Sequence, residues 1–337
     1  MKRSKAKKTG KKRLFGRIAV SVVTVLLLVF IFLTGCVLIM DFGPSETATN
    51  LFVNSVMESS AGKFMATLFF TDEQIKEIRA KNSVVASGEV TDSDMIQIAA
   101  DQDTEDEQST DAIEVQDIEG ATYKGKLMII HDPSRVTVGV SGDYGSGNAG
   151  KSVSQMAESY QAVAATNGGG FEDANGTGNG GTPIGIVISD GVLKYGSAGE
   201  SYEIIGFDRD NKLVVGKMTG QEALDRGVRD ALSFGPILIV NGEPSAVNGE
   251  GSGLNPRTAI GQRADGAILL LVIDGRQVNS LGASYSDLVK IMLNNGAVNA
   301  ANLDGGSSSL MYYNGEYINS CASLYGPRNM PTSIIVR

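Results

Sequence analysis

The chain begins with a basic stretch that gives way to a long apolar one. Residues 1–17 carry nine Lys or Arg and no acid, and residues 18–40 are mostly apolar. A helix crosses a bilayer with roughly 20 apolar residues, and Lys and Arg are retained on the cytoplasmic side. The pattern predicts a cytoplasmic tail (1–17), a single-pass transmembrane anchor (18–40) and an extracellular remainder at the cell membrane.

Two other interpretations use the same residues. A cleaved signal peptide has a shorter apolar core of about 7 to 15 residues. Leu33-Thr34-Gly35-Cys36 resembles the lipobox at which a bacterial lipoprotein is cut before its cysteine. Apolar residues continue through Met40, where a lipoprotein usually turns polar, so we favour the uncleaved anchor. All three interpretations export the rest of the chain.

Two segments separate the anchor from the C-terminal part of the chain. Residues 41–81 place apolar residues at roughly helical spacing, which predicts a helical stalk whose last helix is capped by Thr71. Residues 82–119 contain twelve acidic residues and no basic ones. Such a stretch buries too little apolar surface to order itself, so we predict an acidic linker.

Residues 120–337 alternate short apolar runs with glycine-rich turns and three helical patterns, enough chain for one substantial core. The helices are predicted around Val153–Tyr160, after a capping box at Thr219 and after a similar start at Ser284. Each leads into an apolar strand, at 162–166, 237–240 and 297–303.

Turn signals indicate how some strands pair. Asn241-Gly242 and Asn314-Gly315 are two-residue hairpin turns, and residues 126–130 and 136–140 are predicted to form a hairpin around the loop that holds His131. The predicted class is α+β, with mixed sheets and a few packed helices, preceded by the transmembrane helix and the stalk.

Charge and composition exclude several classes of function. The net charge is −9, and outside the tail 20 basic residues face 38 acidic ones. A chain with no basic patch after its tail is a poor nucleic-acid binder. Cys36 and Cys321 are the only cysteines and His131 the only histidine, so we expect neither a disulfide framework nor a transition-metal site.

Four segments in the last domain run from a strand into glycine and polar residues. Glycine allows close approach of a ligand to the backbone, and strand ends hold side chains rigidly. The segments are Ala164 to Phe171, Asn255 to Ala259, Ile273 to Arg276 and Asn302 to Ser309.

In their order these segments resemble the phosphodiester glycosidases, the family of the mannose 6-phosphate uncovering enzyme. The resemblance covers about residues 120–337. Its blocks are Asn167-Gly168-Gly169-Gly170-Phe171, Thr182-Pro183-Ile184-Gly185, Pro256-Arg257-Thr258-Ala259-Ile260-Gly261, Asp274-Gly275-Arg276 and Asn302-Leu303-Asp304-Gly305-Gly306-Ser307-Ser308. The first block departs from the family's Asn-Gly-Gly-Phe-Phe by an extra glycine before Phe171.

The resemblance implies hydrolysis of a sugar-1-phosphodiester at the anomeric carbon. A carboxylate stabilises the oxocarbenium-like state or activates water, and cations or N–H groups bind the phosphate. The candidate carboxylates are Asp304 and Asp274. The candidate substrate-binding residues are Arg257 as phosphate clamp, the N–H groups of Gly305, Gly306 and Ser307, Asn167 on a sugar hydroxyl, and Phe171, Thr258 and Arg276.

Two alternatives concern single groups. Arg257 could instead form a structural ion pair with one of the two aspartates. The loop with Glu172, Asp173, Asn175 and Asn179 offers oxygen ligands for Ca²⁺, although a substrate-facing lid explains its glycines equally well. No metal or other cofactor is expected for the reaction.

The sequence thus predicts a membrane-anchored extracellular hydrolase of sugar-1-phosphodiester bonds in cell-envelope or exopolysaccharide glycans. The alternative is a non-catalytic glycan-binding or exopolysaccharide assembly protein on the same fold, since one fold hosts many functions. Convergence of Asp304, Arg257 and Asp274 in one cleft would favour the enzyme.

Overall fold

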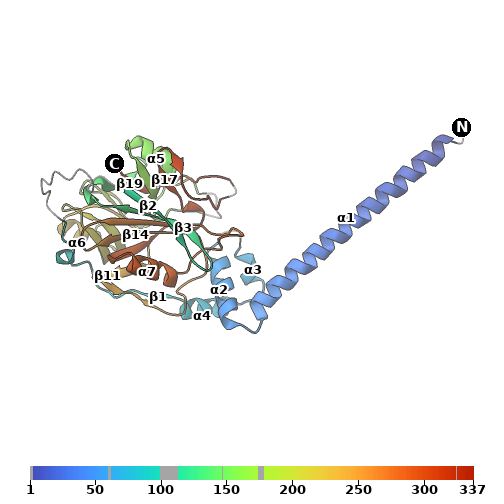
Figure 1. Cartoon of the computed structure of the whole chain (residues 1–337), viewed down its shortest axis with the longest axis horizontal. Coiled ribbons are helices and arrows are strands. Elements are labelled where there is room, and N and C mark those ends of the chain that lie inside the picture. The colour runs from blue at the N-terminus through green and yellow to red at the C-terminus, as the bar shows by residue number, and fades with distance from the viewer. Residues whose placement is uncertain (1–2, 60–61, 99–112, 146, 174–177, 324) are drawn as a thin grey trace.

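A computed structural model describes residues 3–59, 62–98, 113–145, 147–173, 178–323 and 325–337. Figure 1 shows a globular body from which the first helix projects. That helix, α1 (Arg3–Phe42), contains the one described helix long and apolar enough to cross a membrane, Leu14–Phe42. It includes the predicted anchor, residues 18–40.

The predicted stalk is helical, but it packs on the body. It forms α2 (Glu46–Met57), α3 (Phe64–Thr67) and α4 (Asp72–Lys81), and Thr71 caps α4 in a capping box with Gln74. The Leu254 N–H donates to Ser55 Oγ (2.8 Å), and a Cβ on Gly253 would clash with the Ser55 backbone. The α2 helix therefore lies directly against the loop before residue 255.

The acidic stretch differs from the predicted linker at both ends. Residues Val84–Val85 (β1) pair with Ala246–Val247 (β13), and Ile113–Glu119 (β2) pair along their whole length with Lys124–Ile130 (β3). Ile113, Val115 and Ile118 alternate with polar residues in β2 and pack on the core, a strand pattern that the acidic composition conceals. Residues 99–112 lie outside the described part of the chain.

The body is built on three larger sheets in which every described pairing is antiparallel. The seven-stranded sheet has the order β12 (Glu243–Pro244), β11 (Ile237–Val240), β16 (Ala297–Leu303), β14 (Arg257–Arg263), β15 (Ile268–Ile273), β3 and β2. One five-stranded sheet has the order β18 (Glu316–Tyr317), β17 (Met311–Tyr313), β5 (Ala164–Asn167), β19 (Thr332–Val336) and β4 (Val136–Val140). The other has β7 (Val192–Tyr195), β6 (Val187–Ser189), β10 (Val228–Ser233), β8 (Ser201–Asp208) and β9 (Leu213–Thr219).

Alternation along the strands divides the core into layers. In β3, Met128 and Ile130 enter the central core that joins the sheets, whereas Leu127 and Ile129 face the cluster under α7 (Tyr285–Asn294). The helix α5 (Val153–Ser159) packs on the β5 sheet and α6 (Gly220–Asp225) on the β8 sheet. Two of the three helices start at the predicted caps, Thr219 and Ser284, and α5 starts after Ser152, which the sequence analysis did not single out. The α+β content agrees with the predicted class, but the sheets are antiparallel and not mixed.

One predicted hairpin is wrong and two are right. The strands β3 and β4 follow one another in the chain but belong to different sheets, because the short helix η2 (Pro133–Arg135) carries the chain from one sheet to the other. His131 in this connection contacts Glu114 (2.9 Å) at the surface. Asn241-Gly242 joins β11 to β12 and Asn314-Gly315 joins β17 to β18, with positive φ at all four residues.

Candidate functional site

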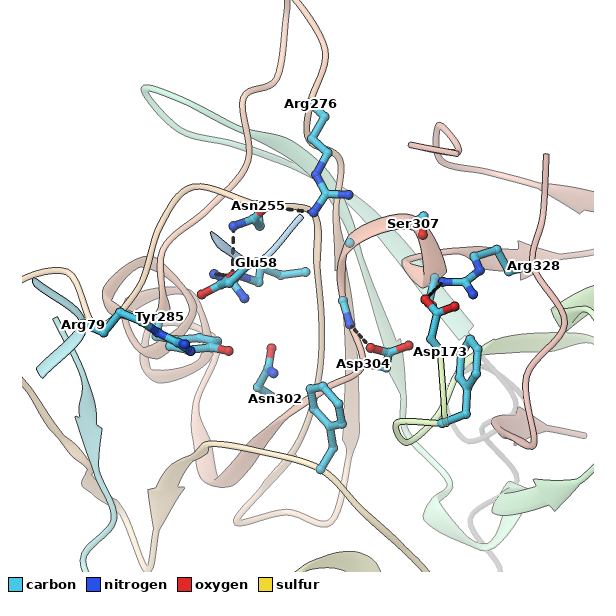
Figure 2. Close-up of a pocket in the computed structure, with 16 residues that line it drawn as sticks. Glu58, Arg79, Asp173, Asn255, Arg276, Tyr285, Asn302, Asp304, Ser307 and Arg328 are labelled. Atoms are coloured by element: carbon cyan, nitrogen blue, oxygen red, sulfur yellow. Dashed lines mark hydrogen bonds and ion pairs between the residues drawn. The ribbon is translucent and has the colours of Figure 1, made fainter. Parts of the chain in front are cut away.

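A cavity of about 320 Å³ lies where the ends of β14, β15 and β16 meet the α2 helix. Figure 2 shows the side chains that point into it from both sides. Four arginines and three carboxylates give it a strongly polar lining. The lining residues are Glu58, Arg79, Phe171, Asp173, Phe234, Asn255, Arg257, Arg276, Tyr285, Asn302, Asp304, Gly305, Gly306, Ser307, Ser308 and Arg328.

Asp304 directly follows β16, and hydrogen bonds hold its backbone in place. Its backbone N–H donates to the Gly168 carbonyl (3.0 Å), and its own carbonyl accepts from Asn167 Nδ2 (2.6 Å). Asn167 is completely buried, and its Oδ1 accepts from Thr258 Oγ1 (2.8 Å) and the Leu310 N–H (3.2 Å). Asn167 and Thr258 therefore support the backbone of Asp304 through hydrogen bonds, and neither is among the residues that line the cavity. This position differs from the prediction that they bind substrate.

The Asp304 carboxyl faces the cavity, where burial raises its pKa to about 6. Hydrogen bonds from Ser308 and from the Gly305 N–H (2.9 Å) oppose this rise without cancelling it. A carboxyl with this pKa is mostly ionised at neutral pH and still close enough to neutrality to exchange a proton. This is the property that a general base in a hydrolase needs.

Arg257 is buried and its guanidinium is held by the protein. Nε donates to the Ala283 carbonyl (3.1 Å) and Nη2 to Ser252 Oγ (2.8 Å), and the group lies 4.2 Å from the ring centre of Tyr285. Its carboxylate partner is Glu58 at 2.8 Å, and neither Asp274 nor Asp304. The predicted structural ion pair exists, but with a residue from the segment predicted as stalk.

Arg276 is the exposed cation at the rim of the cavity (Figure 2). It adopts φ 58° and donates to Asn255 Oδ1 (3.0 Å). Among the described residues no carboxylate lies within ion-pair distance of it. A positive charge without a carboxylate partner, at the mouth of a cavity, is suited to bind an anionic ligand.

The glycine loop after Asp304 is less available for anions than predicted. The Gly305 N–H donates to the Asp304 carboxylate and the Gly306 N–H to the Pro256 carbonyl (2.9 Å). These N–H groups are therefore occupied, although both glycines line the cavity. Ser307 lines it as well, beside Arg328 in Figure 2.

Asp274 is not among the residues that line the cavity. Its Oδ1 accepts from Asn319 Nδ2 (3.0 Å) and from the Ser320 N–H (3.0 Å). It therefore ties the loop after β15 to the loop after β18, and the predicted second catalytic carboxylate has a structural role in this geometry.

Arg328 and Phe171 form the wall nearest Asp304. The Arg328 guanidinium lies 4.8 Å from the ring centre of Phe171 and pairs with Asp173 at 2.8 Å. Burial raises the pKa of Asp173, but hydrogen bonds from Arg328 and the Gly178 N–H outweigh it, so the pKa lies below its ordinary value. Phe171 thus lines the cavity.

The predicted calcium ligands do not gather. Asp173 pairs with Arg328, Asn179 hydrogen-bonds Asn148 and Gly181, and Glu172 lines a neighbouring groove. Asn175 lies outside the described residues. In the part of the chain that the structure describes, no cluster of three or more His, Cys, Asp or Glu forms a metal site.

Asn302 places an unused acceptor in the cavity. Its side chain is 1% exposed and Nδ2 donates to the Gly235 carbonyl (2.7 Å). Oδ1 has no hydrogen-bond partner within the described part of the chain. A buried polar atom left unpaired is costly, so this oxygen is suited to accept a hydrogen bond from a ligand.

Sequence reasoning did not assign Glu58, Arg79 or Arg328 to the site. Glu58 follows α2 and Arg79 lies in α4, where charged residues are read as the solvent face of a helix. Arg328 follows Gly326-Pro327 in a loop outside every motif block, so its only signal was that charged loop residues often serve function.

Comparisons with known proteins identify related sequences. A model of the phosphodiester glycosidase family matches residues 160–337. An uncharacterised prophage-derived protein of Bacillus subtilis (strain 168), YomE, is 33% identical over 180 residues, which cover 50% of this chain and 27% of that protein. The N-acetylglucosamine-1-phosphodiester alpha-N-acetylglucosaminidase of Mus musculus is 29% identical over 223 residues, which cover 60% of this chain and 42% of that enzyme. The chain thus spans less than half the length of these relatives.

A solved structure has a similar fold. The catalytic domain of the zebrafish N-acetylglucosamine-1-phosphodiester alpha-N-acetylglucosaminidase, auto-inhibited by its pro-peptide, superposes with a TM-score of 0.55 at 25% identity. The superposition covers 67% of this chain and 82% of that domain.

Proposed function

Because the chain belongs to the phosphodiester glycosidase family, we propose that it hydrolyses sugar-1-phosphodiesters and that Asp304 is its catalytic base. The observation that carries the proposal is the Asp304 carboxyl, which has a pKa near 6 and faces a cavity lined by four arginines. A diester has one negative charge on its phosphate, so such a cavity suits both the anion and the reacting carbon.

In the proposed step one water attacks the anomeric carbon. A bond forms between the water oxygen and that carbon, and the bond from the carbon to the phosphate oxygen breaks with its electron pair on the phosphate. Asp304 takes one proton from the water, and this proton later passes to solvent. The products are a free sugar and a phosphomonoester. Phosphate leaves without strong protonation, so a single carboxylate close to the anomeric carbon suffices.

The arginines of the cavity differ in whether a carboxylate of the protein already neutralises them. Arg257 pairs with Glu58, and Arg328 with Asp173. Arg276 has only the neutral Asn255 as a partner among the described contacts, and the exposed Arg79, on the α4 side of the cavity, forms no ion pair with a described residue. We assign the phosphate to Arg276 and the sugar to the deeper part of the cavity. There Asn302 Oδ1 accepts a hydrogen bond from a sugar hydroxyl.

The same proposal places the enzyme at the cell surface. The length and composition of Leu14–Phe42 and the nine basic residues in the tail support an uncleaved anchor with a cytoplasmic N-terminus. The substrate is then a glycosyl phosphate in cell-envelope or exopolysaccharide material.

The test is turnover by the full-length chain in detergent on a panel of sugar-1-phosphodiesters. Asp304→Asn should lose at least about a hundredfold in kcat, while Asp210→Asn, the same change on an exposed loop, should keep wild-type rates. Glycan binding without turnover on any member of the panel would instead favour the assembly protein.

A further inference from the structure

The loops that supply the two rim arginines also present apolar side chains to solvent. Arg276 lies in the loop after β15, where Val278 is 104% exposed and Leu281 is 54% exposed. Arg328 lies in the loop before β19, where Tyr325 is 98% exposed. Val278 and Tyr325 are the two most exposed large apolar side chains among the described residues.

The turn that carries Val278 is held by hydrogen bonds. The Gln277 N–H donates to the Ser280 carbonyl (2.9 Å) and the Ser280 N–H to the Gln277 carbonyl (3.2 Å), which fixes Val278 at the tip of a tight turn. Asp274 joins this loop to Asn319 and Ser320, so the two loops form one rim. Single exposed apolar side chains are common on protein surfaces, so whether this rim is a contact surface depends on where it lies relative to the first helix.

The rim lies close to the end of the anchor helix. Arg276 contacts Asn255, and Asn255 Nδ2 donates to Glu58 (2.9 Å) at the end of α2. The α2 helix starts three residues after α1 and has 12 residues, so it is about 18 Å long at 1.5 Å per residue.

The junction between anchor and body carries apolar side chains of its own. The Phe42 ring, the last of α1, stacks on Phe70 with ring centres 5.6 Å apart. Phe64 (59% exposed) and Leu68 (70% exposed) are at α3, in the chain segment that follows Glu58. Exposed apolar side chains therefore occur both at the anchor junction and at the mouth of the cavity.

We propose that this rim rests in the outer surface of the same membrane, and that the substrate is a sugar-1-phosphate esterified to a membrane lipid alcohol. This inference rests on the proposed hydrolysis and on the anchor. Tyr and aliphatic residues are suited to the boundary between headgroups and acyl chains. The cavity mouth then takes the sugar and phosphate, which project from the bilayer, while the lipid chain stays in it.

The reaction is the proposed hydrolysis with a lipid as the alcohol of the diester. Water bonds to the anomeric carbon, the bond from that carbon to the phosphate oxygen breaks, and the lipid keeps its phosphate as a monoester. The sugar leaves into solvent. No further reactant is needed.

The first test does not depend on activity. The chain contains no tryptophan, so Val278→Trp introduces a single fluorophore at the rim. In the full-length protein, reconstituted in vesicles of phosphatidylethanolamine and phosphatidylglycerol, its emission should shift to the blue and be quenched by brominated acyl chains. The matched control is Val192→Trp in β7, where the valine is 53% exposed and lies outside the rim; it should stay unquenched. Equal emission from both positions would overturn the membrane contact.

The second test measures the substrate. Two diesters of one sugar-1-phosphate are compared in the same vesicles, one with a long-chain isoprenoid alcohol and one with ethanol. The wild type should prefer the lipid diester, and Val278→Asp with Tyr325→Asp should lower kcat/KM for it by about tenfold and leave the ethyl diester unchanged. Equal use of the two diesters by the wild type would overturn the lipid substrate and leave the proposed hydrolysis standing. Hydrolysis of neither would contradict both.

Discussion

The floor and the rim of the cavity are built in different ways. The floor is the buried layer beneath the cavity lining. It consists of Asn167, Thr258 and the backbone of Asp304, and the two side chains are buried and hydrogen-bonded to each other. The rim consists of loops and of the α2 helix, and its exposed Arg276 has a single neutral partner. The comparison shows that residues of the sequence motif both support and line the cavity. Four of its seven charged lining residues come from outside the motif: Glu58, Arg79, Asp173 and Arg328.

The largest expected effect is on activity at the rim. Arg276→Ala removes the cation that we assign to the phosphate, so kcat/KM should fall by about 10² to 10³. Its only described side-chain partner is neutral, so the free energy of unfolding should change by less than about 1 kcal/mol. Steady-state kinetics and urea denaturation separate the two. A large loss of stability would show that Arg276 has a structural role, like the residues of the floor.

The next effect is on stability at the floor. Asn167→Ala removes the bond to the Asp304 carbonyl and leaves the buried Leu310 N–H without its acceptor, so the free energy of unfolding should fall by about 2 to 4 kcal/mol. Asn255→Ala at the rim is the comparison. Asn255 is also buried, but its partners Glu58 and Arg276 are partly exposed and can bind water instead, so we expect a loss of about 1 kcal/mol there. Equal losses would remove the distinction between floor and rim.

Asp304 belongs to both regions, and its pKa gives a pH dependence of opposite sign for activity and stability. Below pH about 6 the base is protonated, so kcat/KM should fall about tenfold per pH unit. The folded state binds more protons than the unfolded state between the ordinary pKa of 3.8 and about 6, so the free energy of unfolding should decrease as pH rises through that window and stay low above it. In Asp304→Asn this slope should disappear. A pH–rate profile and denaturation at several pH values check both.

The smallest effect concerns the contact between α2 and the domain. Glu58→Gln leaves the buried Arg257 without its carboxylate, so we expect a loss of about 1 to 2 kcal/mol and a change of a few fold in KM. Glu46→Gln breaks an exposed pair with Lys81 and should leave the free energy of unfolding almost unchanged, because water screens the pair. Thermal unfolding of the two variants side by side is the measurement. Similar small losses in both would mean that α2 is not fixed by Glu58.

Local structure could be predicted from the sequence where the signal is local. The caps at Thr71, Thr219 and Ser284 and the turns at Asn241 and Asn314 depend on a few neighbouring residues, and the structure confirms them. The hairpin expected around His131 is wrong because the choice between two sheets depends on packing far along the chain.

The sequence predicted which segments lie near the site. It did not predict which of their residues line the cavity and which support it. Asp304, Phe171 and Arg276 line the cavity, while Asn167, Thr258 and Asp274 hold the elements that carry them. An asparagine or aspartate after a strand has the same sequence signal in either role. Glu58 enters the site from about 200 positions before Arg257, and no local pattern indicates such an approach.

For the proposed membrane-anchored enzyme, the short link between α1 and α2 would limit how the domain meets its substrate. Three residues separate the two helices and Phe42 stacks on Phe70, so the body is held close to the helix proposed as the anchor. A domain on a long flexible linker samples a volume above the membrane. The domain of this chain would stay at a fixed height above the bilayer and would move only as its anchor diffuses in the lipid. It would therefore meet its substrate by diffusion in two dimensions.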